Sequence, residues 1–118
     1  MARQIPLQCS KEVKDIICLA LRNYAHKAFP DASSPCQMVS RDSLLNSAND
    51  IEQQFSRAGS AAYSSRMRAM LKAAIKFHFD VIDEKAQAYG QLQYELIMAV
   101  CKGEPVTDEQ YQLAKQQD

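Results

Sequence analysis

The chain contains no tryptophan, only three glycines and four prolines, and no long hydrophobic run. Because Gly and Pro are the residues that most often interrupt helices, a chain poor in both favours helical structure. No run reaches the roughly 18 apolar residues that a transmembrane helix needs. The first six residues lack the apolar core of a signal peptide. We therefore expect a predominantly helical, cytoplasmic protein.

An excess of charge of either sign is also absent. The 14 basic and 14 acidic residues give a formal net charge of zero, which argues against a chain that binds polyanions over its whole surface. A length of 118 residues suffices for one domain with a modest core. We expect a single helical domain over residues 1–118, in which residues 1–9 form an extended N-terminal arm.

The sequence shows no recognisable catalytic motif. A Gly-rich phosphate loop, a G-x-S-x-G sequence and the E-x-x-H spacing of two-metal helix sites are all absent. His78 lies on an apolar helix face, whereas the nearby acids Asp80, Asp83 and Glu84 lie well round the helix from it, so we interpret it as a partly buried core histidine. We predict no catalytic, cofactor-binding or metal-binding residues, and so not an enzyme. A small enzyme with a carboxylate site near Asp80 is the reserve hypothesis.

The four cysteines form no C-x-x-C pair and show no zinc-ligand spacing. In a chain without an export signal they are expected to be reduced thiols. They are Cys9, Cys18, Cys36 and Cys101.

Cap residues and breakers divide the chain into helices. Ser10 is a good N-cap for a helix over 11–29, which Pro30 stops. Residues 30–39 hold two prolines and are expected to form the longest loop. Ser40 is then expected to cap a helix over 41–58 that ends at Gly59. A short last helix over 108–116 follows from Thr107 and Gln110, which resemble a capping box.

One apolar stripe keeps its helical phase over nearly 40 residues and predicts a long helix over 61–102. Its members are Tyr63, Met67, Leu71, Ala74, His78, Val81, Ile82, Ala88, Tyr89, Leu92, Leu96, Ala99 and Val100. Gly90 falls on the opposite arc, so we expect the helix to pass through it. The rod would be about 60 Å long, too long for the rest of the chain to cover. The alternative is a turn near Gly90, which would give a more compact four-helix bundle.

The uncovered rod predicts a homodimer. Near its end the helix is apolar almost all round, as expected where a helix is buried on both sides. The residues predicted to mediate self-association are Leu92, Tyr94, Leu96, Met98 and Cys101. Lys85, at the centre of the apolar arc, is expected either to fix the register of the dimer or to extend its ammonium into solvent.

A basic ridge is the second candidate site. No acidic residue occurs between Glu52 and Asp80. The basic residues there are Arg57, Arg66, Arg68, Lys72 and Lys76, and the last three lie within about 80° of one another on a helix. Such a ridge can contact phosphates. It can equally be a solvated face, or pair Lys72 and Lys76 with Asp83 and Glu84 of an antiparallel second copy.

The sequence thus predicts an all-α bundle of three main helices and a short C-terminal one, joined as a homodimer. Its expected function is non-catalytic protein–protein interaction, as an adaptor, regulator or accessory protein. The alternative is a nucleic-acid-binding accessory protein that uses the basic ridge. No cofactor and no membrane partner is expected.

Overall fold

The computed structural model describes residues 3–30, 34–86 and 90–117, with the backbone only for residues 81–86. Within these ranges the chain is mostly helical, as predicted, with a small antiparallel sheet that was not expected. The elements in chain order are β1 (Gln4–Leu7), α1 (Lys11–Ala28), α2 (Pro35–Ala58), β2 (Ala61–Ser64), the 3-10 helix η1 (Ser65–Met67), α3 (Arg68–Ala86), α4 (Gln91–Cys101) and α5 (Asp108–Gln117).

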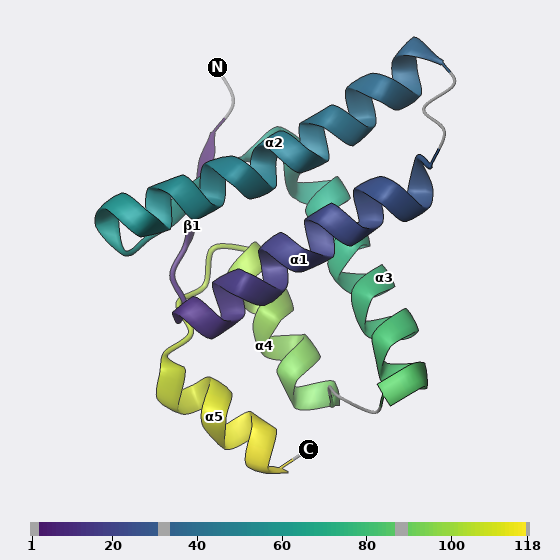
Figure 1. Ribbon diagram of the computed structural model, residues 1–118. Coiled ribbons are helices and arrows are strands. Elements are labelled where there is room, and N and C mark those ends of the chain that lie inside the picture. Colours follow the sequence, from purple (N-terminus) through teal and green to yellow (C-terminus); the bar gives the residue numbers. More distant parts are fainter. Residues whose placement is uncertain (1–2, 31–33, 87–89, 118) are drawn as a thin grey trace.

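Helices α1 and α2 form an antiparallel pair that crosses the upper part of Figure 1, with α3 and α4 descending beneath them and α5 at the lower left. The predicted N-cap of α1 is confirmed, because the Val13 N–H donates to the Ser10 hydroxyl. The predicted end of α2 is confirmed as well: Gly59 has a left-handed backbone with φ of 72°. Tyr24 of α1 packs against Phe77 of α3, with ring centroids 5.6 Å apart.

The start of α2 differs from the prediction. The helix begins at Pro35 rather than at residue 41, and its N-cap is Ser34, whose hydroxyl accepts a hydrogen bond from the Gln37 N–H at 3.2 Å. Pro35 occupies the first turn, where a missing N–H leaves no hydrogen bond unmade. The proline was therefore a helix start and not a loop residue, and Ser40 lies inside the helix.

The predicted continuous helix over 61–102 is wrong. Gly90 has an extended backbone, with φ of −102° and ψ of 177°, and is the N-cap of α4. The Phe79 and Tyr94 rings lie 5.2 Å apart, whereas in one straight helix about 22 Å would separate their positions. Helices α3 and α4 therefore fold back on each other, as in the compact alternative. In α4 the apolar stripe and the buried face differ: Gln93, Ile97 and Cys101 are buried together with the stripe residue Val100, whereas the stripe residues Leu92 and Leu96 are exposed and partly buried, respectively.

The beginning of the predicted long helix is a strand. β2 pairs with β1 in antiparallel register, with Ile5 opposite Tyr63 and Leu7 opposite Ala61. These four side chains are buried, so the N-terminal arm and the segment after Gly59 contribute one face of the sheet to the core. The strands are too short to show a clear alternation, and their pairing joins segments far apart in the sequence.

A side chain from α2 occupies the other side of β2. The Gln54 amide donates to the Ala62 carbonyl at 3.0 Å and accepts from the Ala62 N–H at 2.9 Å. Ala62 lies opposite Pro6 at a non-hydrogen-bonded pair, where the backbone polar groups of each strand point away from the other strand, so the missing N–H of Pro6 takes no hydrogen bond from the ladder. Gln54 therefore satisfies two backbone groups that β1 leaves unpaired.

Helix α4 is joined to the sheet and to α5 by buried polar contacts. The Tyr63 hydroxyl of β2 donates to the Cys101 carbonyl at the end of α4. The Tyr111 hydroxyl of α5 donates to the Gln93 side-chain oxygen of α4 at 3.0 Å. The predicted capping box is confirmed: the Gln110 N–H donates to the Thr107 hydroxyl, and the Thr107 N–H donates to the Gln110 side chain.

The molecule measures 43 × 35 × 21 Å along its principal axes, with a Cα radius of gyration of 14.1 Å. The usual scaling of size with chain length gives a radius of gyration of about 13.5 Å for a compact domain of this length. The long axis is also shorter than the rod expected from the sequence. In the described ranges, no helix has both the length and the apolar character needed to cross a bilayer.

Candidate interaction site

The five residues predicted to mediate self-association all lie on α4, but they do not share one surface. Cys101 is buried in the core, and Tyr94 packs its ring against Phe79 of α3. Leu92 is exposed, and Leu96 and Met98 are partly buried. The helix is apolar nearly all round because β1, α3 and α5 of its own chain each contact it. Of the five, Leu92 and Leu96 line a groove at the surface.

These two leucines line a groove between α4 and α5. We call it the α4–α5 groove; it has a volume of about 250 Å³ and is lined by Leu92, Glu95, Leu96, Gln110, Leu113, Ala114 and Gln117. Leu92 is 38% exposed and Leu113 is 54% exposed. Exposed apolar side chains that line a shared concavity are typical of interaction surfaces.

Sequence reasoning missed Leu113. The signal was present, because Tyr111 and Ala114 are the buried residues of α5 and Leu113 lies off the face that they define. A leucine on the otherwise polar side of a short terminal helix has no core to enter. It was overlooked because the prediction for 108–116 concerned only the cap of that helix.

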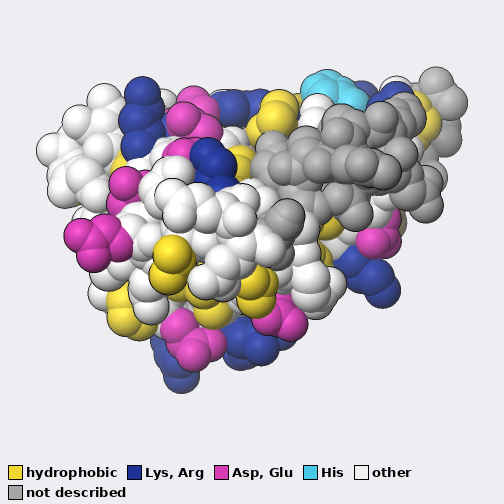
Figure 2. Space-filling model, turned by 90° about the horizontal axis from the view of Figure 1, so that it is seen from below, with side chains coloured by type: hydrophobic (Ala, Val, Ile, Leu, Met, Phe, Trp, Pro, Cys, Tyr) yellow, Lys and Arg dark blue, Asp and Glu magenta, His cyan; other side chains and the backbone are white. Residues whose placement is uncertain are grey.

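On its other side, α5 is attached to α1 by polar contacts. Lys115 pairs with the Glu12 carboxylate at 2.7 Å, and the Gln112 amide donates to it at 2.9 Å. These hydrogen bonds hold the pKa of Glu12 below its usual value. A second groove of about 570 Å³ lies along this junction and includes Ile16 and Leu19. Figure 2 shows this end of the molecule, where hydrophobic side chains reach the surface among charged ones.

The basic ridge extends over three elements. Arg57 lies in the last turn of α2, Arg66 in η1, and Arg68, Lys72 and Lys76 on α3. Four of the five are exposed and Lys72 is half-buried. Within the described ranges none of them takes part in an ion pair.

Two members of the ridge lie close enough to the junction of β2 and α4 to affect the pKa values of side chains there. Burial raises the pKa of Tyr63 to about 12, and the charge of Arg68 opposes this rise. Burial likewise raises the pKa of Cys101 to about 12, against the opposing charge of Lys72. The predicted pairing with Asp83 and Glu84, and the expected behaviour of Lys85, concern side chains outside the described residues.

Cys9, Cys18 and His78 provide little chemistry for catalysis. Burial raises the pKa of Cys9 to about 12 and that of Cys18 to about 11, so both are neutral and weakly nucleophilic at neutral pH. His78 is buried beside Phe79, as predicted, and burial lowers the pKa of its imidazole. In the part of the chain that the structure describes, no three His, Cys, Asp or Glu side chains gather as metal ligands would.

No protein-family model, curated protein or solved structure matches this chain. Its function must therefore be inferred from the geometry of its own surfaces.

Proposed function

We propose that this is a non-catalytic protein that acts through protein–protein contact and forms a homodimer through the α4–α5 groove. The observation that supports this is the position of Leu92 and Leu113, two exposed leucines on the two helices that form one groove. Full burial of a leucine contributes about 1.5–3 kcal/mol, and association would gain the part of this that corresponds to the exposed fractions of Leu92 and Leu113.

A second copy of this chain suits the groove because the same surface provides both an exposed leucine, Leu113, and a concavity. In a two-fold dimer each subunit presents the same patch, so Leu113 of one copy would enter the space between Leu92 and Leu96 of the other. The formal net charge of zero means that two copies do not repel each other over long distances. Glu95, Gln110 and Gln117 would form the polar rim.

The test is a molar-mass measurement by light scattering on wild type and on Leu113→Lys. One chain has a mass of 13.3 kDa, and we expect twice this value for wild type and the single-chain value for the variant. Leu113 is an exposed residue, so the substitution should leave the fold intact, which circular dichroism verifies. The control is Val39→Lys on α2, at another exposed apolar residue, which should remain a dimer. A single-chain mass for wild type, or equal loss in the control, would refute the proposal.

Nucleic-acid binding is the second candidate function. It is favoured by the exposure of Arg57, Arg66, Arg68 and Lys76 in a stretch of chain without acidic residues. Among the described residues none of these cations is in an ion pair, and unpaired cations are available to contact phosphates. Dimerisation would place two such ridges on one particle and raise its affinity for a polyanion.

Fluorescence anisotropy with labelled mixed-sequence duplex DNA tests this candidate at roughly 50 and 200 mM salt, where phosphate-driven affinity should fall steeply. We expect combined charge reversal at Arg66, Arg68 and Lys76 to abolish the binding. Lys27→Glu, an exposed cation on α1, is the matched control and should retain it. Absence of binding at the lower salt concentration would exclude this function for the ridge.

A further inference from the structure

A separate concave site lies where the first turns of α1 approach the last turns of α2. We call it the α1–α2 pocket; it has a volume of about 480 Å³ and is lined by Cys9, Lys11, Lys14, Glu52, Phe55, Ser56 and Gly59. This volume falls in the range of about 300–1,000 Å³ that is typical of small-molecule sites. None of these residues lines the α4–α5 groove, so the pocket is independent of the proposed dimer surface.

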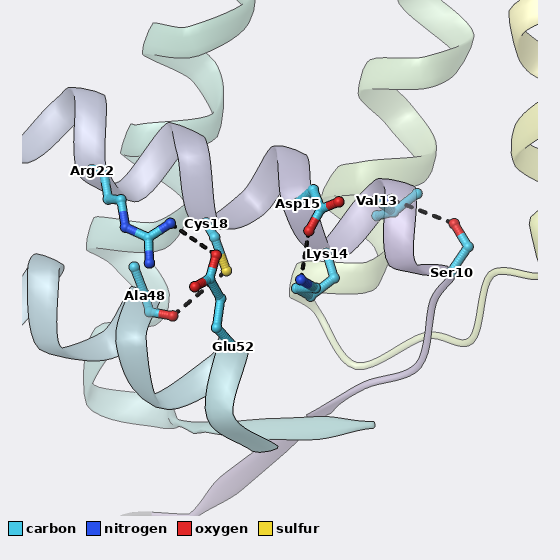
Figure 3. Close-up of polar contacts among 8 residues, drawn as sticks. All are labelled: Ser10, Val13, Lys14, Asp15, Cys18, Arg22, Ala48 and Glu52. Atoms are coloured by element: carbon cyan, nitrogen blue, oxygen red, sulfur yellow. Dashed lines mark hydrogen bonds and ion pairs between the residues drawn. The ribbon is translucent and has the colours of Figure 1, made fainter. Parts of the chain in front are cut away.

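A lysine with little access to solvent forms part of the wall. The Lys14 side chain is only 9% exposed, and its ammonium lies 5.8 Å from the centroid of the Phe55 ring. Such a cation over an aromatic face is stabilised by the ring quadrupole. Its carboxylate partner, Asp15, is the next residue on the same helix and is half exposed. Figure 3 shows the Lys14 and Asp15 side chains meeting at this end of α1.

The other acid of the pocket, Glu52, offsets this charge only in part, because its carboxylate helps to raise the pKa of Lys14 but is hydrogen-bonded to a different cation. Glu52 accepts a hydrogen bond from Arg22 at 2.9 Å, and Figure 3 shows its carboxylate directed toward Arg22 and Cys18, away from Lys14. Lys11 is exposed at the pocket and has no ion-pair partner in the described part of the chain. Asp15 is paired with Lys14 and Glu52 with Arg22, so Lys11 gives the pocket an excess of positive charge. The helix dipole places a further partial positive charge at the N-terminal end of α1.

The remaining walls are suited to an apolar, planar group. The Phe55 ring is only partly buried by its own chain, so part of its surface faces the pocket. The Cys9 thiol is half-buried and remains uncharged at neutral pH, because burial raises its pKa. A neutral thiol behaves as a small hydrophobic group. The pocket thus combines an aromatic wall with two lysines on one side of a helix.

We propose that the α1–α2 pocket binds a small aromatic carboxylate, with its ring against Phe55 and its carboxylate between the Lys11 and Lys14 ammonium groups. The ring would gain dispersion and apolar burial, and the carboxylate would gain charge-assisted hydrogen bonds. Both groups of the ligand are needed, since neither wall is large or charged enough to retain a ligand by itself.

The test is a heteronuclear NMR titration of the full chain with 2-naphthoate and, separately, with uncharged 2-naphthamide. We expect saturable shifts at the backbone amides of 9–14 and 52–59 with the naphthoate, and binding at least about tenfold weaker with the amide, the loss that one charge-assisted contact accounts for. Shifts that are absent from these two segments, or equal affinity for both probes, would overturn the proposal.

Two variants examine the two walls. Lys11→Gln removes an exposed cation without disturbing the core and should weaken naphthoate binding several-fold while leaving the weak naphthamide binding unchanged. Phe55→Leu retains an apolar side chain and should weaken both probes. Lys27→Gln, at an exposed lysine elsewhere on α1, is the control. Unchanged naphthoate affinity in Lys11→Gln would contradict the assigned position of the carboxylate.

Discussion

At the scale of single residues, two glycines have left-handed backbones but different surroundings. Gly59 has φ of 72°, and a Cβ added to it would meet no atom within 4 Å. Gly103 has φ of 96°, and its Cβ would lie 3.3 Å from the Ile5 methyl carbon Cγ2. The first position therefore requires glycine for its conformation only, whereas the second also requires it for the close approach to β1.

We predict that Gly59→Ala lowers the free energy of unfolding by about 1 kcal/mol, the usual cost of a left-handed alanine. Gly103→Ala should lower it by about 2 kcal/mol or more, because close packing against Ile5 adds to that cost. Urea denaturation of the two variants beside wild type measures both values. Equal losses would show that the contact with Ile5 relaxes without cost.

His78 should make the stability of the fold depend on pH. Burial lowers the pKa of its imidazole from the ordinary value of 6.5, so below that pH the unfolded chain binds a proton that the folded chain does not. The free energy of unfolding should therefore be fully retained above pH 6.5 and fall as the pH drops from there toward the folded-state pKa.

The measurement is urea denaturation at roughly pH 7.5 and 5.5, a window that lies above the range in which ordinary carboxylates titrate. We expect wild type to lose stability between these two values and His78→Gln to lose much less. A variant that is equally sensitive to pH would show that another group is responsible.

At the scale of elements, the sequence predicted best where the signals were local. Ser10, Gly59 and the Thr107–Gln110 pair each act within four residues, and the structure confirms all three. The start of α2 was missed because Pro35 was interpreted as a loop residue, although proline also suits a first helical turn.

Long-range effects explain the other errors. The pairing of β1 with β2 joins segments far apart in the chain, and a four-residue strand has too few alternating positions to be distinguished from a helix. Gly90 was placed inside a helix because the apolar phase continues across it. The α4–α5 groove was not predicted: Leu92 and Leu96 were named for self-association along one long helix, whereas Leu113 joins them in a groove only once the chain folds.

The contact between Gln54 and β2 should contribute measurably to stability. Gln54→Ala removes two hydrogen bonds to the Ala62 backbone and should lower the free energy of unfolding by about 1–2 kcal/mol, since water can reach these half-buried groups. The neighbouring Gln53 is exposed, and Gln53→Ala, measured in the same denaturation series, should change stability by less than about 0.5 kcal/mol. Comparable losses in the two variants would mean that the amide contributes little.

At the scale of the whole molecule, self-association should make thermal stability depend on protein concentration. If folded copies associate and unfolded chains do not, dilution from roughly 500 to 5 μM should lower the Tm by mass action. Leu113→Lys should abolish this dependence, whereas Val39→Lys should preserve it. Differential scanning fluorimetry across the dilution series measures the effect, and a constant wild-type Tm would contradict the proposed dimer.

The side chain that bonds Ala62 also restricts how this molecule can assemble. A strand approaching from another chain would need backbone groups that the Gln54 amide already occupies, and on β1 it would meet the ring of Pro6. Open strand edges are the usual templates for runaway β-aggregation, and natural proteins obstruct them. Growth by strand addition is thereby impeded at these two positions of the sheet.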